Sequence, residues 1–101
     1  MKKVIKFSFE GNEGFLSLVE FGNRQYALIH KNTPKVDNIL KSHKLAISLD
    51  LKKDTTFHEV DATISYETDL IEKVYKQLEI EKNLYFKQLD DSLCVIELNI
   101  Y

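Results

Sequence analysis

Four residue types are scarce in this chain, which has one cysteine, one proline, three glycines and no tryptophan among 101 residues. Because Cys94 is the sole cysteine, no disulfide can form within the chain, and this usage is typical of a reducing compartment. Three glycines are too few for a glycine-rich phosphate loop. The sequence also lacks a Pro/Gly/Ser-rich linker, so we expect one domain spanning residues 1–101.

The chain has neither a strongly basic stretch nor a long apolar one. A formal net charge of −2 and a pI near 5.9 supply no positive field, so we expect no nucleic-acid partner. The first apolar run is interrupted by Lys6, Ser8 and Glu10, which argues against a signal peptide, and nothing reaches membrane-spanning length. We predict a cytoplasmic protein that does not enter a membrane.

Six stretches show the alternation or the short apolar runs of β-strands. They cover residues 3–10, 15–21, 25–30, 44–51, 56–66 and 92–100. Gly11-Asn12 and Gly22-Asn23 are hairpin signals that join the first three strands into a meander. The side chains expected to point inward from the fourth and fifth strands are Leu45, Ile47, Leu49, Leu51, Val60, Ala62, Ile64 and Tyr66.

Two amphipathic helices separate these strands. The first is predicted at 34–42, where the Thr33 hydroxyl can accept a capping bond and Pro34 suits the first helical position. The residues that recur at the spacing of one helix face are Val36, Ile39, Leu40 and His43. The second helix begins after Glu67 or Thr68 and carries an apolar stripe. That stripe consists of Leu70, Ile71, Val74, Tyr75 and Leu78.

The element order is therefore βββαββαβ, which predicts a mainly β fold with two helices. An open sheet of six antiparallel strands would leave two edges exposed, and closure into a barrel removes them. We predict a six-stranded antiparallel barrel with both helices on its outside. Residues 80–91 are interpreted as a polar, irregular link.

The start of the first helix is the strongest candidate for a binding site. Helix N-termini attract anions through their free N–H groups and the backbone dipole. Lys31 and Lys35 lie on either side of the predicted cap, and His30 precedes it, so a phosphate would fit here. The alternative is an ordinary helix start whose lysines are solvated.

Other constellations favour neither a metal site nor a nucleophile. His30, His43 and His58 are 13 and 15 residues apart, which is not the spacing of a zinc site. No G-x-S-x-G motif is present, and no cysteine–histidine pairing is indicated. We therefore expect no metal and identify no catalytic side chain.

The element order and three segments resemble the FMN-binding split-barrel family, the pyridoxamine-5′-phosphate-oxidase-like proteins. The segments are the helix start TPKVDNIL at 33–40, LKSHKLAISLD at 40–50 and FHEVDATISYETD at 57–69. The resemblance implies a homodimer with FMN at its interface. It places Thr33 where the family has a phosphate-contacting serine and Lys35 where it has a lysine. His30, Lys31 and Asn32 would lie in the loop beside the cofactor.

The chain departs from the family pattern at several positions. Strand 15–21 lacks the arginine that commonly holds the phosphate, and Ser17 and Glu20 are the polar residues available there. Ile29 stands where a threonine is frequent, and Asp61-Ala62 replaces a step that usually contains glycine.

Two hypotheses stay open. The first is a small FMN-dependent oxidoreductase that reduces a small-molecule substrate, and the basic helix start favours it. The second is a flavin-free split-barrel dimer that serves as a ligand-binding or interaction module, as the haem-handling relatives sharing this scaffold suggest. The missing arginine favours this second hypothesis.

Overall fold

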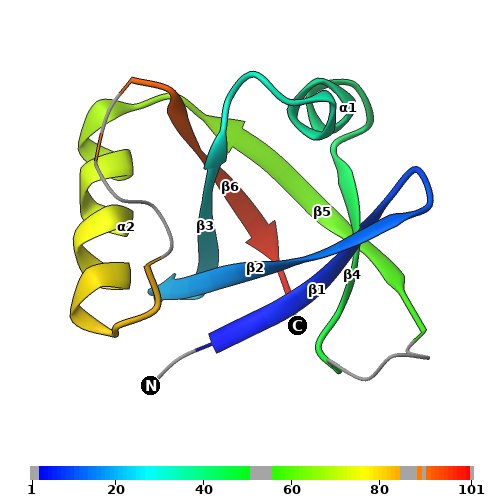
Figure 1. Ribbon diagram of the computed structural model, residues 1–101, viewed down its shortest axis with the longest axis horizontal. Helices are drawn as coiled ribbons and strands as arrows, with labels where there is room; N and C mark the ends of the chain where they lie inside the picture. The colour runs from blue at the N-terminus through cyan, green and yellow to red at the C-terminus, as the bar shows by residue number, and fades with distance from the viewer. Residues whose placement is uncertain (1–2, 51–55, 85–88, 90, 101) are drawn as a thin grey trace.

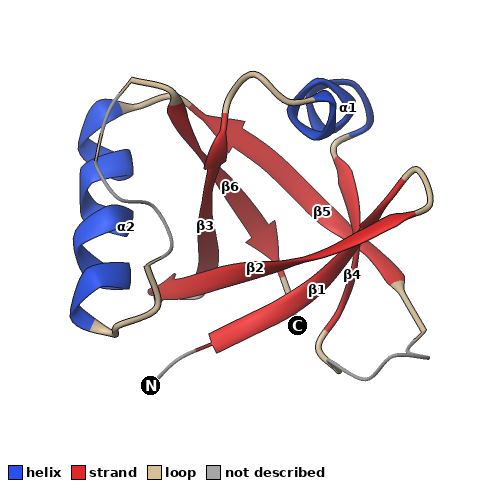
Figure 2. Cartoon of the chain, in the orientation of Figure 1, coloured by secondary structure: helices blue, strands red, loops and turns tan. Residues whose placement is uncertain are grey.

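The chain forms a closed antiparallel barrel of six strands with two helices on its outside (Figures 1 and 2). The computed structural model describes residues 3–50, 56–84, 89 and 91–100. Its elements are β1 (Lys3–Phe9), β2 (Asn12–Phe21), β3 (Arg24–His30), α1 (Pro34–Ser42), β4 (Lys44–Ser48), β5 (His58–Ser65), α2 (Thr68–Ile80) and β6 (Leu93–Asn99). The strand order around the barrel is β1-β2-β3-β6-β5-β4. The predicted order βββαββαβ and the predicted barrel are confirmed.

Two tight turns build the meander of β1, β2 and β3. Phe9 pairs with Asn12, so Glu10 and Gly11 form a two-residue loop in which both φ angles are positive, at 48° and 81°. Such a hairpin loop matches the twist of the flanking strands, and glycine adopts positive φ without strain. Gly22, with φ of 61°, has the same part in the turn between β2 and β3.

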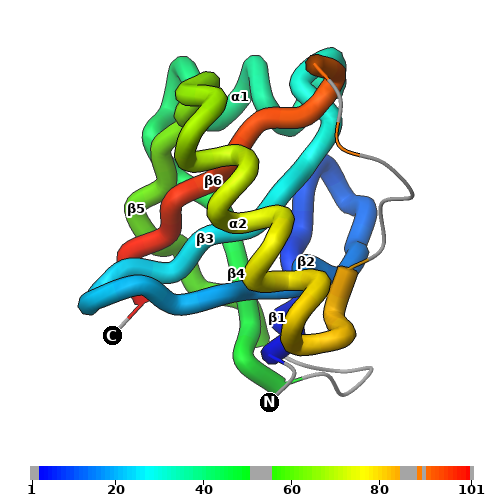
Figure 3. Tube along the Cα trace, turned by 90° about the vertical axis from the view of Figure 1, so that its left-hand side faces the viewer, coloured from blue at the N-terminus to red at the C-terminus, as the bar shows by residue number. Residues whose placement is uncertain are grey.

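Apolar side chains form two clusters, one on each face of the curved sheet. The first fills the barrel and includes Ile5, Leu18, Ile47 and Ile96. The second lies between the sheet and α2, and it contains Val19, Leu28, Ile71, Val74, Leu78, Leu93 and Val95. Figure 3 shows α2 lying across β3 and β6. The apolar stripe predicted for α2 is therefore core, and β2 is apolar on both faces because each face meets one cluster.

β2 and β3 pair along only part of their length. These strands pair only at Val19↔Tyr26, Glu20↔Gln25 and Phe21↔Arg24. The rest of β2 pairs with β1, and the rest of β3 pairs with β6. The two strands therefore diverge from Leu18 and Ala27 onward, and we call this opening the split.

The start of α1 agrees with the prediction except for the cap. Pro34 occupies the first turn, as expected. The Thr33 hydroxyl makes no capping bond, however, and the predicted cap is wrong: the hydroxyl donates back to the carbonyl oxygen of His30 at 3.3 Å. The Thr33 carbonyl oxygen instead accepts from the Val36 N–H at 3.1 Å.

Four side chains predicted to face the core are exposed because they lie at or beyond an element end. His43 has a φ of 57° and ends α1, and Leu40 in its last turn is 46% exposed. Leu49 and Tyr66 are 52% and 51% exposed, since β4 ends at Ser48 and β5 at Ser65. Strand alternation no longer sets their direction there. Leu51 and the predicted turn at 52–55 lie outside the described residues.

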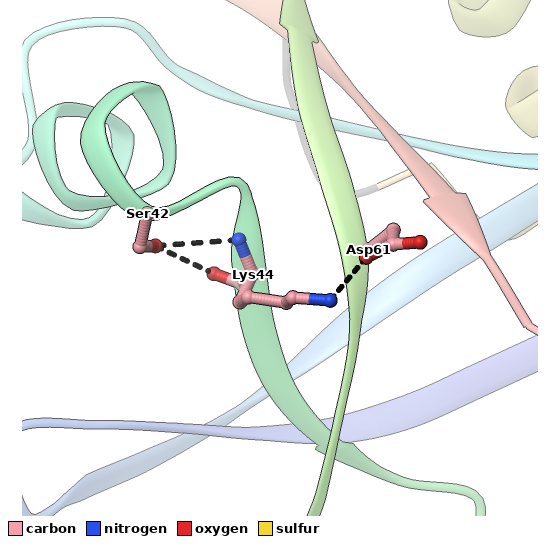
Figure 4. A network of polar contacts seen from close by, with 3 residues as sticks. All are labelled: Ser42, Lys44 and Asp61. Carbon is pink, nitrogen blue, oxygen red and sulfur yellow. Dashed lines mark hydrogen bonds and ion pairs between the residues drawn. The ribbon is translucent and has the colours of Figure 1, made fainter.

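A polar network closes the barrel wall beside the end of α1 (Figure 4). The Ser42 hydroxyl accepts a bond from the Lys44 N–H at 3.2 Å, and the Lys44 ammonium pairs with the Asp61 carboxylate on β5. Asp61 therefore serves as a cross-strand ion-pair partner in an exposed position. Neither helix in the described part of the chain is long and apolar enough to cross a membrane.

Candidate functional site

A cavity of about 360 Å³ lies where β2 and β3 diverge. It is lined by Phe7, Gly14, Phe15, Leu16, Ser17, Leu28, Ile29, His30, Thr33, Lys35, Leu78 and Asn83. The lining is mainly apolar with a few polar groups, which is the usual composition of a small-molecule site. The split therefore leads into a cavity whose lining suits a small-molecule ligand.

Lys35 marks one end of this cavity. Its Nζ lies 3.8 Å from the centre of the Phe7 ring, which is cation–π distance. Burial lowers the pKa of Lys35 below its ordinary value, because a half-buried ammonium is less well solvated. A Cβ at Gly14 would lie 2.7 Å from the Phe7 ring, so glycine at this position lets the ring pack flat against β2.

The start of α1 offers few backbone donors to an anion. Pro34 has no N–H, and the N–H groups of Val36 and Asp37 both point to the Thr33 carbonyl oxygen, at 3.1 and 3.4 Å. Asp37 also places a carboxylate in the first turn. Attraction of an anion to this end of the cavity therefore depends mainly on the Lys35 ammonium.

Two buried polar atoms mark another part of the cavity lining. The Ser17 hydroxyl oxygen and the Asn83 side-chain oxygen have no hydrogen-bond partner within the part of the chain that the structure describes. Asn83 is 2% exposed, and its amide nitrogen donates to the Lys3 carbonyl oxygen at 3.0 Å. This bond fixes the side-chain amide and leaves its oxygen as an unused acceptor.

The structure brings together three of the five residues predicted to hold a ligand. His30, Thr33 and Lys35 line the cavity, and His30 also lies with its Nδ1 3.4 Å from the Ser92 hydroxyl. Lys31 lines a different cavity near the start of α2, together with Tyr66 and Thr68. Asn32 is exposed and is not part of the lining.

Cys94 is not suited to nucleophilic chemistry. It is fully buried in the barrel interior, and burial raises the pKa of its thiol to about 11, so the reactive thiolate is scarce at neutral pH. Among the described residues no group of three or more His, Cys, Asp or Glu side chains could hold a metal ion.

Sequence reasoning missed Asn83 as a site residue and identified Ser17 only as a polar residue on its strand. Asn83 falls in the stretch interpreted as a polar link, directly after the left-handed turn at Lys82, with φ of 56°. Nothing in the local sequence distinguishes an asparagine facing a cavity from one facing solvent. Its position at the cavity follows from the bond of its side-chain nitrogen to the Lys3 carbonyl oxygen, which only the folded chain creates.

Searches with the sequence find no matching family model and no matching curated protein. Solved structures do match. A NimC/NimA family protein from Clostridium acetobutylicum superposes with a TM-score of 0.61 at 14% identity, covering 95% of this chain and 71% of that one. A candidate pyridoxamine 5′-phosphate oxidase from Listeria innocua superposes with a TM-score of 0.59 at 15% identity, covering 96% of this chain and 81% of that one.

This chain has the pyridoxamine-5′-phosphate-oxidase-like split-barrel fold. The predicted resemblance is thereby confirmed for the architecture. At these identities the likeness concerns the fold, so the ligand must be argued from the residues that line the split.

Proposed function

We propose that this split barrel is a small FMN-binding flavoprotein that carries out oxidation or reduction of a small molecule. The observation that carries the proposal is the half-buried Lys35 ammonium at the end of an apolar cavity of about 360 Å³. A cation at one end and an apolar body suit a flat ring that bears a phosphate on a flexible arm. Proteins of this fold generally bind a flavin.

The phosphate would lie at the end formed by Lys35, Thr33 and His30. Lys35 would supply the positive charge, and a charge-assisted bond is about twice as strong as a neutral one. His30 ends β3 and Thr33 precedes α1, and both line this end of the cavity. The Thr33 hydroxyl and the exposed His30 ring are therefore the polar side chains that could contact the phosphate beside Lys35.

The flat ring would lie among the apolar side chains of β2, β3 and α2. Phe7, Leu16 and Leu28 present carbon surface there, and the cavity is open enough for a ring to enter through the split. When bound, FMN supplies the hydride or electron chemistry, and the protein supplies position and electrostatics. No side chain of this chain needs to act as a nucleophile.

We further expect a homodimer, as the family resemblance implies. Phe15 lines the cavity mouth and is 60% exposed, so a second copy that covered it would bury apolar surface and shield the cavity from water. Size-exclusion chromatography with light scattering tests this expectation. A monomer at micromolar concentration would contradict it.

Titration of the purified protein with FMN, followed by flavin fluorescence, tests the proposed function. Replacing Lys35 with alanine should weaken FMN binding about tenfold, the value of one charge-assisted hydrogen bond. Lys41→Ala is the matched control, since Lys41 lies in the last turn of the same helix. The proposal fails if the wild-type protein does not bind FMN, or if Lys35→Ala and Lys41→Ala bind it equally well.

One observation favours the alternative of a flavin-free binding module. The first turn of α1 uses its Val36 and Asp37 N–H groups internally and carries the Asp37 carboxylate, which weakens its attraction for a phosphate. In this case the same cavity would take an uncharged, mainly apolar ligand. Failure of the wild-type protein to bind FMN in the titration above would favour this alternative.

A further inference from the structure

The unused Ser17 and Asn83 atoms line the same cavity although they come from elements far apart in the sequence. Ser17 lies on β2, and Asn83 follows the end of α2. A buried polar group without a partner destabilises a protein, so such groups are few and usually have a reason. Two of them on one cavity indicate that a ligand supplies the missing partners.

These two residues lie at the opposite end of the cavity from Lys35. Asn83 is bonded to Lys3, and Ser17 pairs with Val4, so both are beside the start of β1. Lys35 lies over Phe7, four residues further along the same strand. At a strand rise near 3.3 Å per residue the two ends are ~13 Å apart. Figure 1 shows the same arrangement, with the start of β1 near the end of α2.

The chemistry of the two atoms is complementary. The Asn83 side-chain oxygen is a carbonyl oxygen and can only accept a hydrogen bond, and the bond from the amide nitrogen to the Lys3 carbonyl oxygen fixes which way the amide faces. The Ser17 hydroxyl can donate as well as accept. Together they can bind a ligand edge on which an N–H group lies beside a carbonyl group.

We propose that Asn83 and Ser17 form a recognition site for an imide edge, with the Asn83 oxygen accepting from the ligand N–H and the Ser17 hydroxyl donating to the adjacent carbonyl oxygen. This inference rests on the proposed function, since the oxidised flavin ring carries one N–H group, in its imide. The phosphate at Lys35 then places the imide edge at the far end of the cavity. Asn83 and Ser17 are thus specificity-determining residues that select the ring.

Binding of FMN and of FMN methylated at the imide nitrogen (N3) tests this site. In the wild-type protein methylation should weaken binding about tenfold, because it removes the donor that Asn83 accepts. Asn83→Ala should weaken binding of FMN by a similar factor and should bind the two flavins equally. Ser17→Ala should weaken FMN binding severalfold and keep part of the discrimination. Asn99→Ala, at the exposed end of β6, is the control and should discriminate as the wild type does.

The outcomes separate this inference from the proposed function. If FMN binds and Lys35→Ala weakens it, but the wild-type protein binds both flavins equally, the proposed function stands and the imide site is wrong. If the wild-type protein binds no FMN, both are wrong. Because Asn83→Ala also loses the bond to Lys3, thermal unfolding of this variant is measured as a control. If the variant does not fold, the comparison of the two flavins on the wild-type protein decides between the outcomes.

Discussion

Polar side chains on the side of β4, β5 and β6 differ in their pairing from those that line the split. On the side of β4, β5 and β6 the charged side chains pair across strands: Lys44 binds Asp61, and Glu97 binds Arg24 and accepts from the Thr63 hydroxyl. At the split the Lys35 cation lies on an aromatic ring, and the Ser17 and Asn83 oxygens are unused. Polar pairs also bridge strands near the split, as Gln25 and Glu20 do across β3 and β2. The difference therefore lies in the Ser17 and Asn83 oxygens, which have no partner among the described residues and which we propose bind a ligand.

The largest expected effect concerns the well-packed side. Ile96 on β6 is fully buried, and its strand is paired with β3 and β5. Ile96→Ala should lower the free energy of unfolding by about 2–5 kcal/mol, through lost burial and the cavity left behind. Urea titration measures this. Ile80→Ala is the control, since Ile80 is 72% exposed at the end of α2 and should change little. Equal losses of stability in the two variants would contradict the placement of Ile96 in the barrel interior.

The next effect concerns Lys35 and depends on pH. Only the protonated ammonium attracts a phosphate, and the pKa of Lys35 is lowered by burial. The ratio of FMN affinity to riboflavin affinity should therefore fall as the pH rises, and it should fall at a lower pH than for an ordinary lysine. The fall should approach the roughly tenfold loss expected for Lys35→Ala. Taking the ratio cancels ionisation of the ring itself, and a ratio independent of pH would remove Lys35 from the phosphate site.

A comparison of two serines tests the difference between the two sides directly. Ser48 is buried, and its hydroxyl accepts from the Asp50 N–H at 3.1 Å, whereas the Ser17 hydroxyl is unused. Ser48→Ala should destabilise the ligand-free protein by about 1 kcal/mol. Ser17→Ala should leave it unchanged or slightly more stable, since no bond is lost. Thermal unfolding of both variants decides, and a clear loss of stability in Ser17→Ala would show that its hydroxyl has a structural role.

The smallest effect is expected for the Lys44–Asp61 pair in Figure 4. The two side chains are 49% and 57% exposed, and solvent and salt screen such pairs. A double-mutant cycle with alanine at both positions should give a small coupling energy, and added salt should reduce it. A larger, salt-independent coupling would mean that the pair is less solvated than its exposure indicates.

The sequence allowed the strands and helices to be predicted because each has one face against a core. The alternation of apolar and polar residues in β5 and the apolar stripe of α2 both result from burial of one face. The errors fall where burial stops determining direction, at Leu49 and Tyr66 beyond their strand ends. Thr33 occupies the N-cap position as predicted, but its hydroxyl makes no capping bond and donates to the His30 carbonyl oxygen.

The candidate site was only half predictable. Lys35 and Thr33 could be chosen because a helix start has known chemistry, which the local sequence displays. Asn83 could not be chosen, because its interest lies in a side-chain oxygen that has no partner among the described residues. The folded chain sets this by placing Asn83 beside Lys3, which is distant in the sequence. Lys31 looks equivalent to Lys35 in the sequence, but the chain direction after β3 sends it to another cavity.

Only three paired positions join β2 to β3, as few as join β1 to β4, and β2 and β3 diverge beyond them. A ligand in the split would contact both strands, at Ser17 on β2 and at His30 on β3. A bound ligand would therefore link β2 to β3, and these two strands should become less mobile when the cavity is occupied.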